Sequence, residues 1–159
     1  MPSAAVLTVS DRVSQGLAAD ESGPVLVELL RRRGFDVVQE NVVPDDVSAI
    51  TAALVSLCDK AQLVLTTGGT GLGPRDRTPE ATQALADYLV PGLAEEMRRA
   101  GRERTPLAVL ARGVCAVRGG SLIVNLPGRP KGAVESVEAV IDALGHALDL
   151  LQGKTEHPA

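Results

Sequence analysis

The stretch that decides the fold occupies residues 63–80 and reads LVLTTGGTGLGPRDRTPE. Residues 62–67 form a short run of apolar and β-branched side chains, which predicts a buried strand. Thr78 is suited to cap a helix at its N-terminus, and Pro79 is suited to the first helical position. The stretch therefore predicts a strand, a loop and a helix, with the loop at the carboxyl end of the strand, where open α/β sheets bind ligands.

The loop carries four glycines within six positions, followed by two arginines on either side of an acid: Gly68, Gly69, Gly71, Gly73, Arg75, Asp76 and Arg77. Glycines let the backbone adopt positive φ angles and approach a ligand closely. Consecutive backbone N–H groups in such a loop can bind phosphate or carboxylate. A tight turn needs only one or two glycines, so we interpret the loop as a binding loop. It is neither a P-loop nor the dinucleotide fingerprint, because the residues that complete those motifs are missing.

Composition narrows the classes of function. A chain of 159 residues predicts a single domain, residues 1–159, that needs no disulfide or metal to fold. Aromatic residues make up 1% and the net charge is −4, which argues against nucleic-acid and membrane binding. Cys58 and Cys115 make no metal-ligand spacing and read as small hydrophobic residues. With no signal peptide and no long apolar run, the sequence predicts a cytoplasmic protein.

The first half of the chain alternates between strand and helix patterns. Strands are predicted at residues 4–9, 36–43 and 62–67, with a helix at 21–33 and another after residue 46. This order predicts a parallel sheet covered by helices.

Acidic residues follow two of these strands. Asp11 either holds its loop or faces a ligand. Asp46 is expected to cap the next helix. Asp45 is then free for chemistry, or it interacts with the helix dipole.

The second half is less regular. Helices are predicted at residues 79–88, 91–100 and 133–151, a strand at 107–112, and two paired strands at 113–117 and 121–126. The helix at 91–100 is expected to stop at Gly101, to turn Leu93 and Met97 inward, and to present a solvated or subunit-facing surface of Glu95, Glu96, Arg98 and Arg99. His146 is interpreted as a structural or surface residue, and His157 as part of a polar tail.

Residues 125–132 form a second distinctive loop, rigid because it holds two prolines and two glycines. Its Arg129 and Lys131 suit phosphate, although the segment is equally an ordinary connection between strand and helix. Three loops at strand ends, residues 44–46, 68–77 and 125–131, thus gather backbone donors, cations and acids. Phosphates with Mg²⁺ use all of these groups, which favours phosphoryl or nucleotidyl transfer.

Several motifs, in order along nearly the whole chain, resemble the MogA/MoaB family of molybdenum cofactor biosynthesis. They are TVSDR at 8–12, TTGGTG at 66–71, PRD at 74–76 with TPE at 78–80, PG at 91–92, and NLPG at 125–128 with PKG at 130–132. The resemblance implies a three-layer α/β/α fold with a mixed, mostly parallel sheet. It also implies a trimer or a dimer of trimers.

The implied activity is that of a molybdopterin adenylyltransferase, which transfers AMP from Mg-ATP to the molybdopterin phosphate and releases pyrophosphate. Its substrates are ATP and molybdopterin, its metal is Mg²⁺, and a molybdenum-inserting protein is a possible downstream partner. The resemblance assigns catalysis and Mg²⁺ binding to Asp45 and Asp76. Substrate or phosphate binding is assigned to Ser10, Asp11, Thr67, Gly68, Gly69, Thr70, Gly71, Arg75, Arg112, Asn125, Pro127, Gly128 and Lys131.

Two positions depart from the family pattern. Ala111 stands where members often have serine, and Arg129 also replaces a serine; both are expected near the pterin. An alternative reading is therefore a paralogue that binds molybdopterin or acts as a scaffold without catalysis. A different nucleotide-binding transferase is a third reading.

Overall fold

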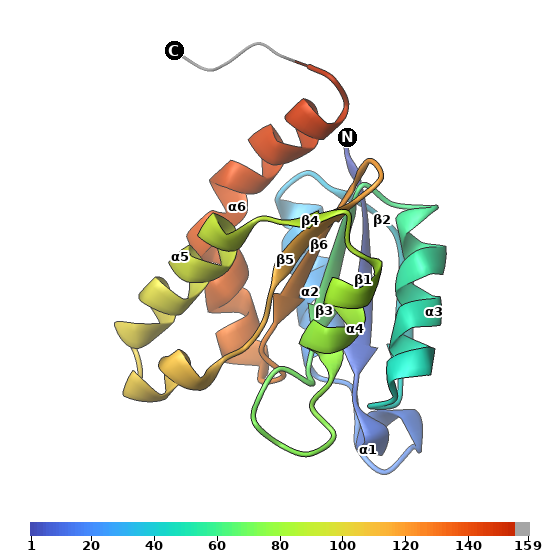
Figure 1. Ribbon diagram of the computed structural model, residues 1–159, viewed down its shortest axis with the longest axis vertical. Coiled ribbons are helices and arrows are strands. Elements are labelled where there is room, and N and C mark those ends of the chain that lie inside the picture. The colour runs from blue at the N-terminus through green and yellow to red at the C-terminus, as the bar shows by residue number, and fades with distance from the viewer. Residues whose placement is uncertain (155–159) are drawn as a thin grey trace.

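The computed structural model describes residues 1–154, so His157 lies outside the described residues (Figure 1). Six strands form one sheet in the order β2-β1-β3-β6-β5-β4. Their bounds are β1 Ser3–Val9, β2 Asp36–Val43, β3 Leu63–Thr67, β4 Tyr88–Leu89, β5 Cys115–Arg118 and β6 Ser121–Leu126. Strands β2, β1, β3 and β6 are parallel, and β5 is antiparallel to both of its neighbours. The predicted mixed, mostly parallel sheet is confirmed.

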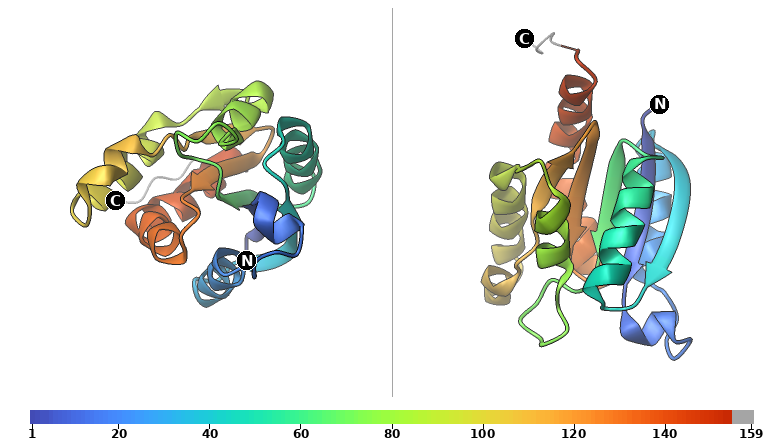
Figure 2. Two further views of the ribbon diagram at one scale, coloured as in Figure 1. Left: turned by 90° about the horizontal axis from the view of Figure 1, so that it is seen from below. Right: turned by 45° about the vertical axis from the view of Figure 1, so that its right-hand side comes forward.

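Helices cover both faces of this sheet (Figure 2). They are α1 Asp11–Ser14, α2 Ser22–Arg32, α3 Val47–Cys58, α4 Thr78–Leu85, α5 Pro91–Arg102, the 3₁₀ helix η1 Pro106–Leu110, and α6 Pro130–Leu151. The core on one face is built with α2, α5 and α6, and the core on the other face with α3 and α4. This arrangement confirms the three-layer α/β/α fold. None of the helices within residues 1–154 is long and apolar enough to cross a membrane.

The central strands are apolar on both faces because both faces are covered. In β1, Val6 packs into the core under α2 and α6, whereas its neighbour Leu7 packs into the core under α3. Both side chains are fully buried. Burial of one such side chain stabilises the fold by about 1.5–3 kcal/mol. The continuous apolar runs that predicted these strands therefore reflect burial from two sides.

Two helix ends in the middle of the chain differ from prediction. Thr78 was expected to be the N-cap of α4, but the N-cap is Arg77 and Thr78 is the first helical residue. The Thr78 hydroxyl instead donates to the Gly68 carbonyl at 3.0 Å. The same helix ends at Leu85, because Tyr88 pairs with Val117 at the start of β4.

The prediction of a strand at residues 107–112 is wrong. The segment forms η1, which begins after Thr105, whose hydroxyl accepts a hydrogen bond from the Leu107 N–H at 3.3 Å. Its apolar side chains Leu107 and Val109 are exposed, so the apolar run does not mark a buried strand. Helix α5 also runs through Gly101 and ends at Arg102.

Strand β3 leaves the sheet through a residue that must be glycine. Gly68 has a φ of 103°, and a Cβ there would collide with the carbonyl oxygen of Val9 in β1. The Gly68 N–H donates to the Leu126 carbonyl of β6 at 3.1 Å, and Gly128 approaches the Gly68 Cα. The backbones of three strands therefore converge at Gly68.

We expect Gly68→Ala to lower the free energy of unfolding by more than about 2 kcal/mol, because a strained backbone costs about 1–3 kcal/mol and the collision with Val9 adds to it. Gly119→Ala is the matched control. Gly119 also has a positive φ of 57°, but it lies in an open turn with nothing near its Cβ position. Gly119→Ala should therefore lower the free energy of unfolding by only about 1 kcal/mol. Urea denaturation of both variants measures the difference, and equal losses would contradict the steric argument.

The predicted cap of α3 is confirmed, since the Asp46 carboxylate accepts the Ala49 N–H at 2.9 Å. We expect Asp46→Ala to lower the free energy of unfolding by about 1 kcal/mol, because the variant leaves a helix-end donor without its partner. Ser48→Ala, on the exposed surface of the same helix, should change it little. Parallel denaturation curves with equal midpoints would show that the cap contributes nothing.

Candidate active site

The loops that carry the predicted site residues lie at one edge of the sheet. Because β1, β2, β3 and β6 are parallel, their carboxyl ends meet at the lower edge in Figure 1. The loop of residues 68–77 projects from this edge, beside α1. Topology therefore brings together segments that are far apart in the sequence.

Asp11 and Asp45 join the ends of β1 and β2 through a reciprocal pair of hydrogen bonds. The Asp11 N–H donates to Oδ2 of Asp45, and the Asp45 N–H donates to Oδ1 of Asp11, each at 3.0 Å. Asp11 thus holds the loop of residues 44–46, which was one of its two predicted roles. Burial raises the pKa of the Asp45 carboxyl, and the charges of Asp11 and Asp76 raise it further.

Arg75 balances part of this negative charge. Its Nε donates to Oδ2 of Asp11 at 2.6 Å and its Nη2 donates to Oδ1 at 3.1 Å, in the two-bond fork typical of arginine and carboxylate. The Arg75 hydrogen bond is the main reason that the pKa of Asp11 lies below its usual value. Arg75 itself is mostly exposed, so the glycine loop and β1 are tied together at the surface.

Asp45 and Asp76 border the glycine loop at different glycines. A Cβ on Gly69 would lie 3.1 Å from Oδ1 of Asp45, and one on Gly71 would lie 3.0 Å from Oδ2 of Asp76. Oδ2 of Asp76 also accepts the Gly73 N–H at 2.9 Å. The second oxygen of each carboxylate, Oδ1, makes no hydrogen bond within residues 1–154. The two acids named for catalysis therefore lie beside the same loop, each with an oxygen available.

Arg112 braces the glycine loop from the side of η1. Its guanidinium donates to the Gly71 carbonyl at 2.8 Å and to the Asp76 carbonyl at 2.9 Å, and it forms a fork with Glu80 at 2.7 and 3.2 Å. This fork lowers the pKa of Glu80. In the structure Arg112 thus contacts protein groups, and its binding of phosphate stays a prediction.

Two further residues predicted to bind substrate are buried and hydrogen-bonded to protein. The Asn125 amide donates to the hydroxyls of Thr66 at 3.1 Å and Thr82 at 3.0 Å, and its oxygen accepts the Val114 N–H at 3.1 Å. The Thr67 hydroxyl donates to the Pro127 carbonyl at 2.7 Å. These bonds position the ends of β3 and β6, and substrate contact by either residue stays a prediction.

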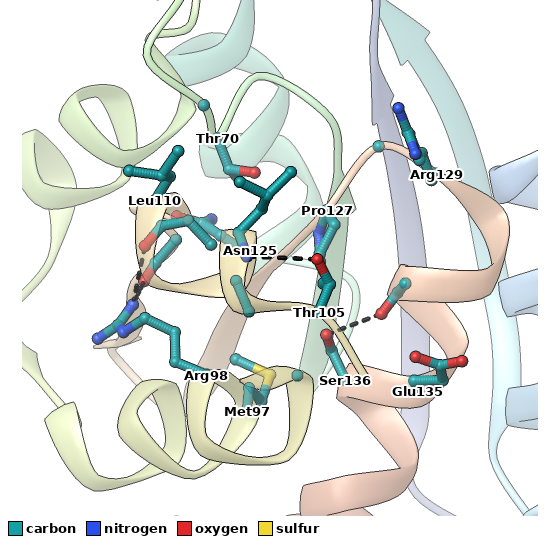
Figure 3. A pocket seen from close by; sticks show the side chains of 18 of the residues that line it. Thr70, Met97, Arg98, Thr105, Leu110, Asn125, Pro127, Arg129, Glu135 and Ser136 are labelled. Carbon is teal, nitrogen blue, oxygen red and sulfur yellow. Dashed lines mark hydrogen bonds between the residues drawn. The ribbon is translucent and has the colours of Figure 1, made fainter. Parts of the chain in front are cut away.

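Two cavities flank the converging loops. The larger, of about 810 Å³, lies between the glycine loop, α5, η1 and the start of α6 (Figure 3). Of the predicted residues, it is lined by Gly69, Thr70, Gly71, Asp76, Asn125, Pro127, Gly128 and Lys131. The smaller, of about 200 Å³, is lined by Ser10, Thr67, Gly68 and Gly128 among others. Ser10 was expected to share a pocket with residues 125–131, and it lines the smaller cavity together with Gly128 and Pro130 of that segment. The remaining predicted residues of the segment, Asn125, Pro127 and Lys131, line the larger cavity, which shares Gly128 with the smaller one.

The two departures from the family pattern line the larger cavity. Ala111 follows η1 in its wall, and Arg129 precedes α6 as an exposed side chain. Lys131, two positions further along, is also exposed. Both cations are therefore accessible to an anion at the rim.

The larger cavity also contains residues that the sequence did not indicate, Arg98 and Glu135 among them. Arg98 was assigned to a solvated or subunit-facing surface. Its Nη1 instead donates to the carbonyls of Gly113 at 3.0 Å and Ala111 at 3.5 Å, and so holds the segment that carries Arg112. Its partners lie 13 and 15 positions away, so helical periodicity gave no signal for this contact.

The acids at this edge fit a metal ion only together with substrate. Within residues 1–154, no group of three or more His, Cys, Asp or Glu side chains could hold a metal. Mg²⁺ commonly binds one or two carboxylates plus the phosphates of a substrate. Asp45 and Asp76, each with an available oxygen, match that pattern.

We expect Arg75→Gln to raise the pKa of Asp11, and by a smaller amount that of Asp45, because loss of a neighbouring positive charge disfavours the ionised carboxylate. Titration of the side-chain carboxyls by NMR measures both values. Arg77→Gln is the matched control, since Arg77 acts on Glu80 instead. An unchanged Asp11 titration in Arg75→Gln would show that the fork does not govern its charge.

Comparison with known proteins agrees with this architecture. Residues 5–146 match the family described as a probable molybdopterin binding domain. A molybdopterin adenylyltransferase of Helicobacter pylori is 40% identical over 152 residues, which cover 93% of this chain and 86% of that protein. A molybdenum cofactor biosynthesis bifunctional protein of Synechococcus elongatus is 38% identical over 151 residues, which cover 94% of this chain but only 47% of that protein.

A solved structure shows the same fold. The molybdopterin biosynthesis enzyme MoaB of Thermus thermophilus is 50% identical, superposes with a TM-score of 0.91, and matches over 97% of this chain and 98% of that one. This chain belongs to the MogA/MoaB family of molybdopterin-binding domains.

Proposed function

We propose that this chain is a molybdopterin adenylyltransferase of molybdenum cofactor biosynthesis. The observation that supports this most directly is the position of Asp45 and Asp76, which border one glycine loop between two cavities. A relative that is 40% identical over 93% of the chain carries that name. Two substrates whose phosphates meet at the loop would account for both cavities.

In the proposed reaction, a terminal phosphate oxygen of molybdopterin attacks the α-phosphorus of ATP. The new P–O bond joins the two phosphates, the bond between the α- and β-phosphates breaks, and pyrophosphate leaves with the electron pair. Such transfers need mainly positioning and charge stabilisation. Bound Mg²⁺ would neutralise charge on the phosphates.

The residues of the loop edge take distinct roles in this proposal. Backbone N–H groups of Gly69, Thr70 and Gly71 orient phosphate oxygens, as glycine-rich loops do. Asp45 and Asp76 would hold Mg²⁺ together with the substrate phosphates, and the ion would neutralise phosphate charge there. Lys131 supplies positive charge at the rim, where its side chain is exposed. Arg112 acts through the loop that it braces.

We assign molybdopterin to the larger cavity and part of the nucleotide to the smaller one. The larger has room for a tricyclic pterin and presents the apolar side chains of Met97, Leu110 and Pro127. The smaller is lined by Ser10 and Gly68, on the opposite side of Gly128. In this arrangement the two phosphates meet between the cavities, beside Asp45 and Asp76.

The wider setting is also part of the proposal. We propose that residues 1–159 act as one domain, in the cytoplasm, within a trimer or hexamer. The proposed downstream partner is a molybdenum-inserting protein that receives the product; the Synechococcus relative that matches this chain over 47% of its own length is described as bifunctional.

We expect Asp76→Asn to keep the fold and to lower the rate of adenylyl transfer by about 10²-fold or more, because a preorganised charge is lost where phosphate charge must be held. Purified protein is incubated with molybdopterin and Mg-ATP, and adenylylated pterin and pyrophosphate are quantified. Asp142→Asn, an exposed acid on α6 outside both cavities, is the control and should keep the full rate. An unchanged rate in Asp76→Asn would remove this acid from the mechanism.

The same assay separates the proposal from its alternative. Product from the unmodified protein supports the enzyme. If molybdopterin binds but no product forms, the chain is instead a binding or scaffold protein. Ala111 and Arg129, which both line the larger cavity, are then the first positions to restore to serine.

A further inference from the structure

The larger cavity has opposite polarity at its two ends. Backbone donors of the glycine loop lie at one end, beside Thr70, and Glu135 of α6 lies at the other; Figure 3 shows Thr70 and Glu135 far apart across the cavity. Among the described residues, Asp76 and Glu135 are the two acids that line it. Because Asp76 belongs to the loop end, Glu135 is, among the described residues, the one carboxylate at the end remote from the glycine loop.

Glu135 pairs with two cations through one of its oxygens and retains capacity to accept hydrogen bonds. Its side chain is 22% exposed, and Oε1 lies 3.2 Å from Nη1 of Arg104 and 4.0 Å from Nζ of Lys131. Oε2 makes no hydrogen bond within residues 1–154. A carboxylate has about four acceptor positions, so the two cations leave most of them for a ligand. Arg104 contacts one oxygen of the carboxylate, whereas Lys131 comes only within 4.0 Å and its side chain, 87% exposed, can turn away toward a phosphate at the rim.

A pterin matches this arrangement of charge. Its amino-pyrimidinone ring presents two parallel N–H donors, from the 2-amino group and from N3, at the end opposite the phosphate-bearing arm. Two parallel donors suit a carboxylate, as the arginine fork does. Between the ends, Met97 and Leu110 offer apolar contact to a flat ring. A molecule with phosphate at one end and paired donors at the other would span the cavity.

We propose that Glu135 recognises the amino-pyrimidinone edge of the pterin and thereby selects substrates that carry the 2-amino group. This inference rests on the proposed function, because it takes molybdopterin to be the ligand of the larger cavity. Glu135 contacts the ring at the end remote from the reacting phosphate. It is therefore a specificity-determining residue. Its substitution should weaken pterin binding more than it lowers the reaction rate of the bound complex.

The test measures binding without ATP. Molybdopterin is titrated into the full-length protein, and free pterin and lumazine, which has an oxygen in place of the 2-amino group, are used as competitors. We expect Glu135→Gln to weaken molybdopterin binding on the order of tenfold, because the amide offers only one of the two acceptors. The preference for pterin over lumazine should shrink as well. In turnover, KM for molybdopterin should rise while kcat changes little.

Two controls separate recognition from structural support. Glu138→Gln, on the same helix and paired with Arg33 at 3.9 Å outside the cavity, should leave binding and selectivity unchanged. Arg104→Gln removes the ion pair but keeps the carboxylate, so the preference for pterin should persist. If Arg104→Gln loses that preference as fully as Glu135→Gln, the ion pair and not the carboxylate is responsible, and the inference is overturned.

The outcomes also distinguish this inference from the function on which it rests. Adenylyl transfer by the unmodified protein, with equal pterin preference in Glu135→Gln, would overturn the role of Glu135 and leave the enzyme intact. Failure of the unmodified protein to bind molybdopterin would overturn both. If Glu135→Gln loses the preference for pterin over lumazine and the two control variants keep it, the result supports both the role of Glu135 and the proposed function.

Discussion

The site depends on a contact between backbones that leaves no room for a side chain. Gly68 lies directly against the carbonyl of Val9, donates its N–H to Leu126, and has its Cα 3.4 Å from where a Cβ on Gly128 would lie. Three strands therefore end at almost the same point. The chain can leave β3 only with a positive φ, and this direction brings Gly69 and Gly71 beside the two catalytic candidates.

The next constraint is electrostatic, because the carboxylates of Asp11, Asp45 and Asp76 gather at this edge. Arg75 pairs with Asp11 in a fork, but an exposed pair of this kind contributes only about 0–1 kcal/mol to stability. Its larger effect is on charge, since it keeps Asp11 ionised while Asp45 remains next to two negative neighbours. Two unit charges about 4 Å apart interact by roughly 4 kcal/mol at an effective dielectric constant of about 20, and like charges such as these carboxylates repel each other. A divalent cation held with phosphate would relieve this repulsion, which gives a physical reason for acids to lie beside a phosphate loop.

The larger cavity is assembled from elements that pack around this fixed edge. Helices α5 and α6 pack on the same face of the sheet, and η1 connects α5 to β5 through a segment whose Arg112 N–H donates to the Thr70 carbonyl of the glycine loop at 2.9 Å. Arg98 bonds the carbonyls of Ala111 and Gly113, and Arg112 between them bonds the carbonyls of Gly71 and Asp76. Helix α5 is thus connected to the glycine loop through two guanidinium groups.

The sequence by itself determined the features that depend on neighbouring residues. Short apolar runs placed β1, β2 and β3, and Asp46 marked the start of α3, because burial and capping leave local patterns. Parallel strands bring their carboxyl ends together, so the sequence also indicated which loops form the site. Motif resemblance singled out Asp45 and Asp76 in those loops.

Only the tertiary structure decided which side chains were already engaged by protein partners. Thr78 bonds Gly68 instead of capping its helix, and Arg98 turns from the expected surface toward η1. The apolar run at 107–112 formed a 3₁₀ helix. Glu135, on α6, pairs in the cavity with Arg104, which lies 31 positions away. Each outcome depends on a partner distant in sequence, and hydrogen bonds between such partners form only when the packed sheet and helices bring them within reach.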